Sequence, residues 1–213
     1  MAKSIVFSCD DGHPLDLKVA RIMAGKGIKG IFYVPIVNLI DGREVLKTKE
    51  IRELSQDFEI GCHGYSHGDL TRMSPKSAAL DIKRGKERLE DILGKKVTSF
   101  CPPKGRYNRG ILEIAQKLGF EDVRSARTFN INPRGESFLW HPNLHIFPHT
   151  LEKDVRDCLL NSDLKSTWAR LTLAGESHLG LLKYLKRRLE KVHVWFHSWE
   201  LEKYGLWDFI EKL

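Results

Sequence analysis

The sequence lacks the features that mark several classes of protein. None of its apolar runs approaches the roughly 18 residues that a membrane-spanning helix needs. Four cysteines are spread over 213 residues without a CxxC pair, which argues against a structural zinc knot or a disulfide scaffold. No repeat, low-complexity segment or nucleic-acid-binding motif is present. What is left is a globular domain of ordinary composition, with 41% hydrophobic and 30% charged residues.

The first residues also lack the marks of a secretory signal peptide. MAKSIVFSCDDG enters a strand-like run at once, without a charged leader, an apolar stretch and a small-residue cleavage site. We therefore expect a cytoplasmic protein. The length suits one sizeable core and is short for two, which predicts a single domain over residues 1–213. The sequence leaves the oligomeric state open.

Positive charge is in excess, with a formal net charge of +7. Part of it lies in KYLKRRLEK, residues 183–191, where Tyr184, Leu185 and Leu189 form an apolar stripe at helical spacing. A helix with a solvated basic face is the simplest interpretation. Contact with an anionic lipid or glycan is the alternative, and we expect no nucleic-acid partner.

Predicted strands alternate with predicted helices along the chain. Short β-rich runs cover residues 4–9, 28–35, 58–62, 97–101, 121–126 and 192–197. Helical patterns cover residues 15–27, 47–57, 75–93, 108–119, roughly 151–191, and 206–213. Residues 128–150 contain three prolines and follow neither pattern. Successive strand–helix units predict an α/β fold built on a parallel sheet or a barrel.

Chemically reactive side chains follow four of the predicted strands. The first strand is followed by Asp10 and Asp11, the third by His63, and the fourth by CPPKGRYN, residues 101–108. The last strand ends at His197. In both kinds of parallel sheet, ligand sites gather at the carboxyl ends of the strands. We therefore expect these distant residues to converge on one face of the protein.

The stretch EIGCHGYSHGDL, residues 59–70, carries two histidines four positions apart. If the chain turns helically there, His63 and His67 fall on one helix face and can bind one ion. Two imidazoles and one carboxylate, with a position open to water, form a recurring catalytic zinc set. The doublet Asp10-Asp11 offers one carboxylate for a metal and one for a general base. Asp-Asp-Gly is also an ordinary turn, and a polar loop with two histidines is the simpler alternative.

A second group of histidines has the same spacing. HPNLHIFPH places His141, His145 and His149 four positions apart. Pro142 and Pro148 break any helix there, so we expect these histidines to line a substrate wall at most, rather than to hold the metal.

Four stretches of the sequence together resemble the ordered motifs of a known family. FSCDDGH, EIGCHGYSHGDLTRMS, FCPPKGRYN and HVWFHSWEL are similar to those of the polysaccharide deacetylases, also called the NodB-homology or carbohydrate esterase 4 family. The resemblance runs from near Ile5 to near Trp207, and it departs at Gly64, where Ser or Thr is usual. It implies a distorted (β/α) barrel of about seven parallel strands, resembling the TIM barrel, over a single catalytic domain.

The resemblance implies a role for each matching residue. Asp10 matches the catalytic base, and His197 matches the histidine that protonates the leaving amine. Asp11, His63 and His67 match the ligands of a divalent metal ion, which we expect to be Zn²⁺.

The third motif departs from the family pattern, which begins Arg-Pro-Pro-aromatic-Gly. Here residues 101–105 read CPPKG, so the arginine that steadies the base is missing. Arg124 and Arg127, which follow the fifth predicted strand, are the candidates to replace it. The aromatic residue whose backbone N–H helps to bind the oxyanion is replaced by Lys104, and a backbone donor does not depend on the side chain. Lys104 and Tyr107 are the expected contacts for substrate or oxyanion.

These roles imply a metal-dependent hydrolase that removes an acetyl group from an N-acetylated sugar or glycan precursor, free or linked to a lipid or nucleotide. Two alternatives stay open. The same fold supports other hydrolases of C–N amide bonds, such as deformylases. A non-catalytic glycan-binding protein with a degenerate site is the other alternative, and the missing motif-three arginine and aromatic residue motivate it.

Overall fold

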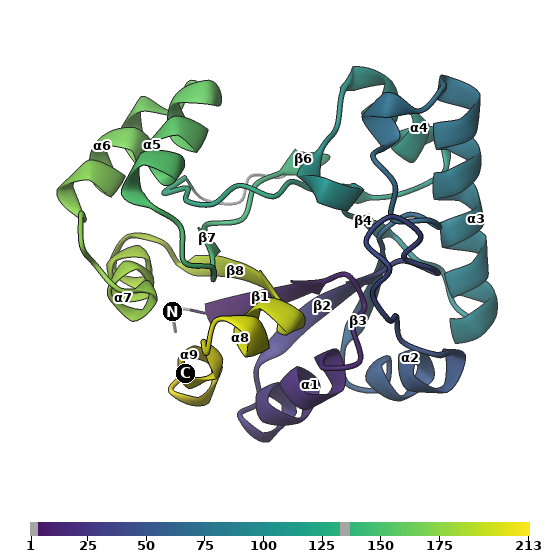
Figure 1. The fold of residues 1–213 in the computed structure, drawn as a ribbon, viewed down its shortest axis with the longest axis horizontal. Coiled ribbons are helices and arrows are strands. Elements are labelled where there is room, and N and C mark those ends of the chain that lie inside the picture. The colour runs from purple at the N-terminus through teal and green to yellow at the C-terminus, as the bar shows by residue number, and fades with distance from the viewer. Residues whose placement is uncertain (1–3, 133–136) are drawn as a thin grey trace.

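A single sheet of eight parallel strands organises the protein in the computed structural model, which describes residues 4–132 and 137–213 (Figure 1). Every pair of neighbouring strands is parallel, as the alternation of strands and helices predicts. The strands are β1 Ser4–Asp10, β2 Lys29–Val34, β3 Glu59–Cys62, β4 Ser99–Phe100, β5 Asp122–Arg124, β6 Leu139–Trp140, β7 Leu144–His145 and β8 Lys191–His197.

The order of the strands requires the sheet to curl. The order is β6-β5-β4-β3-β2-β1-β8-β7, so two consecutive strands, β6 and β7, lie at opposite edges. In a flat sheet, seven spacings would place these edges about 34 Å apart. The chain from Trp140 to Leu144 reaches at most about 14 Å. The sheet therefore bends into a half-barrel whose edges approach each other, which agrees with the distorted barrel that the resemblance implies.

Helices cover the outside of the curled sheet (Figure 1). The helices are α1 Asp16–Gly25, α2 Thr48–Leu54, α3 Pro75–Leu93, α4 Arg109–Lys117, α5 Leu151–Leu160, α6 Leu164–Thr172, α7 His178–Arg188, α8 Ser198–Lys203 and α9 Trp207–Glu211. Two short 3₁₀ turns, η1 Leu70–Arg72 and η2 Pro103–Gly105, lie in the connecting loops.

Sequence signals explain where the longest helix begins and ends. The Ser74 side chain accepts a hydrogen bond from Ser77 N at the start of α3, and Pro75 occupies the first helical position. Gly94 ends the helix in the left-handed conformation that favours glycine. One face of α3 is buried, and it places Asp81 and Gly85 beside the loop that follows β3.

Strands β6 and β7, in the described part of the stretch over residues 128–150, are not predicted by the sequence. Strands of two residues, such as β6 and β7, are too short to show an alternating pattern. They make eight strands where the resemblance implies about seven. Residues 133–136 of this stretch lie outside the described residues.

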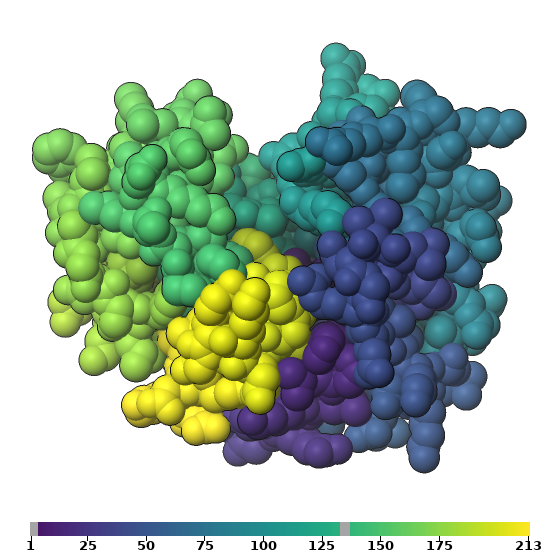
Figure 2. Space-filling view, in the orientation of Figure 1, coloured from purple at the N-terminus to yellow at the C-terminus, as the bar shows by residue number. Residues whose placement is uncertain are grey.

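The core lies between the sheet and its helices. Phe7, Phe32, Phe100 and Phe196, on four different strands, are each exposed by 1% or less. The carboxyl ends of these strands lie at one rim, where the surface is hollowed between the segments of α4 and α5 (Figure 2). In the described part of the chain, every helix is too short or too polar to cross a membrane.

Candidate active site

The end of β1 carries two buried carboxylates that face different partners. Asp10 is 2% exposed and Asp11 is 4% exposed. Asp11 leaves the strand with a φ of 77°, in the left-handed region that side chains other than Asn, Asp and Gly rarely adopt. The Asp11 carboxylate contacts histidines, whereas that of Asp10 contacts an arginine.

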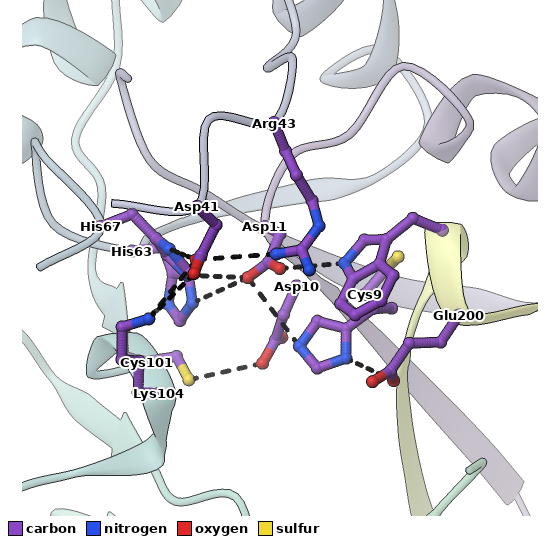
Figure 3. Close-up of polar contacts among 12 residues, drawn as sticks. Cys9, Asp10, Asp11, Asp41, Arg43, His63, His67, Cys101, Lys104 and Glu200 are labelled. Carbon is purple, nitrogen blue, oxygen red and sulfur yellow. Dashed lines mark hydrogen bonds and ion pairs between the residues drawn. The ribbon is translucent and has the colours of Figure 1, made fainter. Parts of the chain in front are cut away.

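Asp11, His63 and His67 form a compact group of possible metal ligands (Figure 3). Asp11 Oδ1 lies 2.9 Å from His67 Nε2 and 3.5 Å from His63 Nε2. The three ligand atoms lie within 4.8 Å of one another, and all three residues are buried. Trp199 Nε1 donates a hydrogen bond of 3.0 Å to the other oxygen, Asp11 Oδ2, and so fixes the plane of the carboxylate.

Hydrogen bonds on the far side of each imidazole orient the two histidines. His63 Nδ1 lies 2.7 Å from the carbonyl oxygen of Cys101, and His67 Nδ1 lies 3.1 Å from Asp41 Oδ2. Carbonyl and carboxylate oxygens accept hydrogen bonds, so each Nδ1 can act as a donor, which leaves each Nε2, on the Asp11 side, available as the metal-binding nitrogen. This arrangement of outer hydrogen bonds is usual for histidines that bind metals.

The donor set fits a divalent ion such as zinc. Two imidazole nitrogens and one carboxylate oxygen, with room for a further ligand, form a common catalytic zinc set. Burial alone raises the pKa of Asp11, but His197, His63 and His67 outweigh it and hold that pKa well below its usual value. An ionised carboxylate is the form that binds a metal.

A competing group fits less well. Asp10, His63 and Cys101 also offer three ligand atoms within 4.8 Å of one another. Burial raises the pKa of the Cys101 thiol well above its usual value, and the thiolate is the form that binds zinc. Asp10 is already paired with Arg124. We therefore assign the candidate ligands to Asp11, His63 and His67.

A loop, and not a helical turn, brings His63 and His67 together. The condition of a helical turn is not met, because the residues after β3 form an irregular loop and His67 has a φ of 57°. Asp81 of α3 holds this loop by accepting hydrogen bonds from Tyr65 N, from Ser66 N and from Ser66 Oγ. The side chain of a helix residue therefore sets the spacing of the two histidines.

Gly64 departs from the family motif for a local reason. Its φ is 74°, and a Cβ there would lie 2.8 Å from Asp81 Oδ1. A Cβ on Gly85 of α3 would lie 2.6 Å from the carbonyl carbon of Gly64. The helix thus approaches the backbone of the loop more closely than a side chain at either position allows.

Arg124 lies against Asp10, where the third motif lacks its arginine. Arg124, at the end of β5, is fully buried, and its guanidinium contacts both carboxylate oxygens of Asp10. The same nitrogen lies 3.1 Å from Cys101 Sγ. The other candidate, Arg127, does not reach Asp10 and instead pairs with Asp163 at 3.3 Å.

The two substrate candidates lie in different surroundings. Lys104 has a φ of 60° and lines a cleft of about 290 Å³ together with Asp10, His63 and His197. Its Nζ lies 3.2 Å from Asp41 Oδ1. Tyr107 is half-buried and packs against the hydrophobic core, and it is not among the described residues that line this cleft.

His197 faces the metal group from the opposite side of β1. It is the direct neighbour of Asp10 in the register of β1 and β8, and its Nε2 lies 3.8 Å from Asp11 Oδ1. His197 Nδ1 donates a hydrogen bond of 2.6 Å to Glu200 Oε2. Burial alone lowers the pKa of His197, but Asp11 and Glu200 raise it to about 9. His197 therefore carries a proton at neutral pH.

The second histidine group does not join the ligands around Asp11 within the described residues. His141 Nδ1 hydrogen-bonds Ser125 Oγ at 2.6 Å. His145 and His149 line the cleft, as expected for a substrate wall.

Sequence reasoning missed four residues that support the site: Asp41, Asp81, Trp199 and Glu200. Of these four residues, only Glu200 could have been predicted as a partner of His197 from the sequence, because it follows His197 by three positions at the start of α8. Asp41 reaches the site from a loop and Asp81 from the predicted helix α3, and no motif marks either residue.

Comparisons with known proteins agree with this architecture. The sequence profile of the family described as polysaccharide deacetylase matches residues 1–123. A chitin deacetylase of Arthroderma benhamiae is 34% identical over 126 residues, which cover 56% of this chain and 33% of that protein. The peptidoglycan-N-acetylglucosamine deacetylase PgdA of Listeria monocytogenes is 24% identical over 124 residues, covering 57% and 25%. The chain spans between a quarter and two thirds of the length of the curated relatives that it matches.

The fold has solved counterparts as well. The deacetylase PplD of Streptococcus pyogenes, solved in complex with acetate, superposes with a TM-score of 0.58 at 20% identity, over 70% of this chain and 67% of that one. This likeness confirms the expected fold class. Since the family profile covers more than half of the chain, the protein belongs to the polysaccharide deacetylase family.

Proposed function

We propose that this protein is a metal-dependent hydrolase that removes the acetyl group from an N-acetylated sugar or glycan precursor. Its family hydrolyses N-acetyl amide bonds. One observation carries the proposal: the consecutive carboxylates Asp10 and Asp11 have different partners, one an arginine and the other two histidines. This arrangement separates a base from a metal ligand by a single peptide unit.

Asp11, His63 and His67 would hold the ion. When bound, a divalent ion polarises the acetyl carbonyl and lowers the pKa of water from about 15.7 to about 7. Lys104 and His197 both line the cleft beside these residues, where the substrate would bind. The Lys104 backbone N–H is the proposed donor to the oxyanion.

Asp10 would accept the proton of the attacking water. The buried Arg124 keeps Asp10 oriented by contacting both of its oxygens. This pairing supports the proposal, because Arg124 of β5 places a guanidinium beside Asp10 although Cys101 stands where the family motif has its arginine.

His197 would donate a proton to the leaving nitrogen, since an amine leaves only when it is protonated. Its Nδ1 is held by Glu200, so its Nε2 remains free to point toward the cleft. Glu200 therefore acts as a positioning residue, because it touches His197 and not the reacting atoms. Products would be acetate and a free amino sugar.

Acetate release from N-acetylated sugars tests the proposal. The purified chain should release acetate, lose this activity with a chelator and regain it with Zn²⁺. Asp10→Asn should lose about 10²–10⁴ in turnover, the usual contribution of one acid–base group. The matched control His141→Gln, which lies outside the proposed machinery, should stay within about twofold.

The substrate assays also separate the alternatives. Release of formate but not acetate would favour another C–N amide hydrolase on the same fold. Absence of turnover on N-acetyl and N-formyl sugars, with sugar binding retained, would favour the glycan-binding protein. The linkage of the sugar to a lipid or nucleotide and the cytoplasmic location stay predictions from the sequence.

A further inference from the structure

A second group of metal-ligating side chains lies on the far side of His197. His197 Nδ1 is 2.6 Å from Glu200 Oε2, and His145 Nε2 is 3.4 Å from the same oxygen. All three atoms lie within 4.8 Å of one another. None of them belongs to the group around Asp11, because His197 uses its other nitrogen on that side.

The side chain of His145 is buried, and one of its two ring nitrogens has no hydrogen-bond partner among the described residues. Its side chain is 5% exposed, and its ring stacks on Trp195 with centroids 3.6 Å apart and planes 5° from parallel. His145 Nδ1 lies 2.7 Å from His149 Nε2. Its Nε2 points toward Glu200 but makes no hydrogen bond within the described part of the chain. Burial lowers the pKa of His145 to about 3, so the imidazole is neutral.

These side chains have the chemistry of a zinc site. Two imidazole nitrogens and a glutamate oxygen form a donor set that is common at zinc. Glu200 Oε2 accepts the hydrogen bond of His197 Nδ1, which favours the carboxylate form that binds a metal. His145 and His197 both line the cleft, so an ion in the cleft reaches them directly.

We infer that His145, His197 and Glu200 form a second, inhibitory Zn²⁺ site that shares the cleft with the proposed catalytic one. An ion on His197 Nδ1 displaces the proton that is donated to Glu200. His197 then loses the hydrogen bond to Glu200 that orients it, and with it the position that the proposed proton donor needs. The inhibitory effect rests on the proposed function, whereas the site itself does not.

Direct metal binding tests the site. At Zn²⁺ raised to about the millimolar range, the parent should bind two ions per chain and His145→Gln should bind one. The His67→Ala variant, which lacks a ligand of the first site, should bind one ion, and His67→Ala/His145→Gln none. The matched control His67→Ala/His141→Gln should keep the ion. A second ion retained in His145→Gln, or a parent that binds only one, would overturn the inference.

Turnover measured in zinc buffers tests the inhibition. Raising Zn²⁺ until the second site fills should lower the parent's turnover at least tenfold, consistent with the loss of one acid–base group. His145→Gln, compared with its own rate at low Zn²⁺, should lose less than twofold. Equal inhibition of both proteins would place the inhibitory ion elsewhere. If the parent releases no acetate at low Zn²⁺ but binds two ions, the proposed function fails while the second site stands.

Discussion

Replacing Arg124 by methionine tests the pairing that the sequence alone does not resolve. Arg124 is fully buried and Asp10 is 2% exposed, so the variant leaves a buried carboxylate without its cation. Removing one partner of a buried ion pair costs about 3–5 kcal/mol. Domains of this kind are stable by about 5–15 kcal/mol, so Arg124→Met should lose a large share of its stability.

The same change should move the pH profile of activity. The unpaired carboxylate lowers its energetic cost by taking up a proton, which removes the proposed base. The acidic limb of the profile should therefore lie at higher pH in Arg124→Met than in the parent. Arg124→Met should be least active at acidic pH and regain part of its activity as the pH rises.

A double variant separates charge from packing. Arg124→Met/Asp10→Asn removes both charges, so it should recover most of the lost stability while staying inactive. Urea unfolding measures the stability of all three proteins, and acetate release from pH 5 to 10 measures their profiles. A loss below about 1 kcal/mol in Arg124→Met together with an unchanged pH profile would refute the pairing.

The Cys101 position gives a reciprocal test. Cys101 is fully buried, and its Sγ lies 3.1 Å from the Arg124 guanidinium. A second guanidinium has neither space nor a free partner there, so Cys101→Arg should lower activity. In an Arg124→Cys background the same substitution should restore part of it. A Cys101→Arg enzyme clearly faster than the parent would show that Arg124 does not replace the missing motif residue.

Three further predictions concern other parts of the site. His67→Ala should lose tight binding in zinc buffers of low free Zn²⁺ without unfolding, and full occupancy in that variant would contradict the ligand set. The pKa of His197 is raised to about 9, so His197 keeps its proton up to about that pH. Activity should therefore fall as the pH rises above that value, which forms the basic limb of the activity profile. Glu200→Gln should move this basic limb of the activity profile down by about 1–2 pH units. An unmoved limb would show that the limb does not report the proton of His197. Gly85→Ala should lower the unfolding midpoint and weaken zinc binding together, since its Cβ meets Gly64; a silent substitution in both assays would show that the loop adapts.

The sequence locates the site because parallel strands present their ends at one rim. Asp10, His63 and His197 each follow an apolar run, so their convergence needs no knowledge of the loops. The conformation of His67 did not follow from spacing. Four positions suggest a helical turn, but hydrogen bonds to Asp81, a residue distant in sequence, hold a left-handed loop instead.

The sequence could not show whether Arg124 or Arg127 pairs with Asp10, for a similar reason. Both lie near the end of the same predicted strand, and only the observed end of β5 distinguishes them. Arg124 is the last residue of the strand and points inward, whereas Arg127 lies beyond it and finds Asp163. A strand of three residues is too short for its end to be set by pattern alone.

The pairing of β1 with β8 has a consequence for folding. The proposed base at the end of β1 and the proposed acid at the end of β8 are neighbours in register, although nearly the whole chain separates them. Closing so long a loop is entropically costly and makes contacts of this kind slow to form. Until β8 adds, β1 presents an unpaired strand edge, which is a template for aggregation. Catalytic competence should therefore arise only when β8 pairs with β1, and a nascent chain should depend on protection of that edge until β8 has left the ribosome.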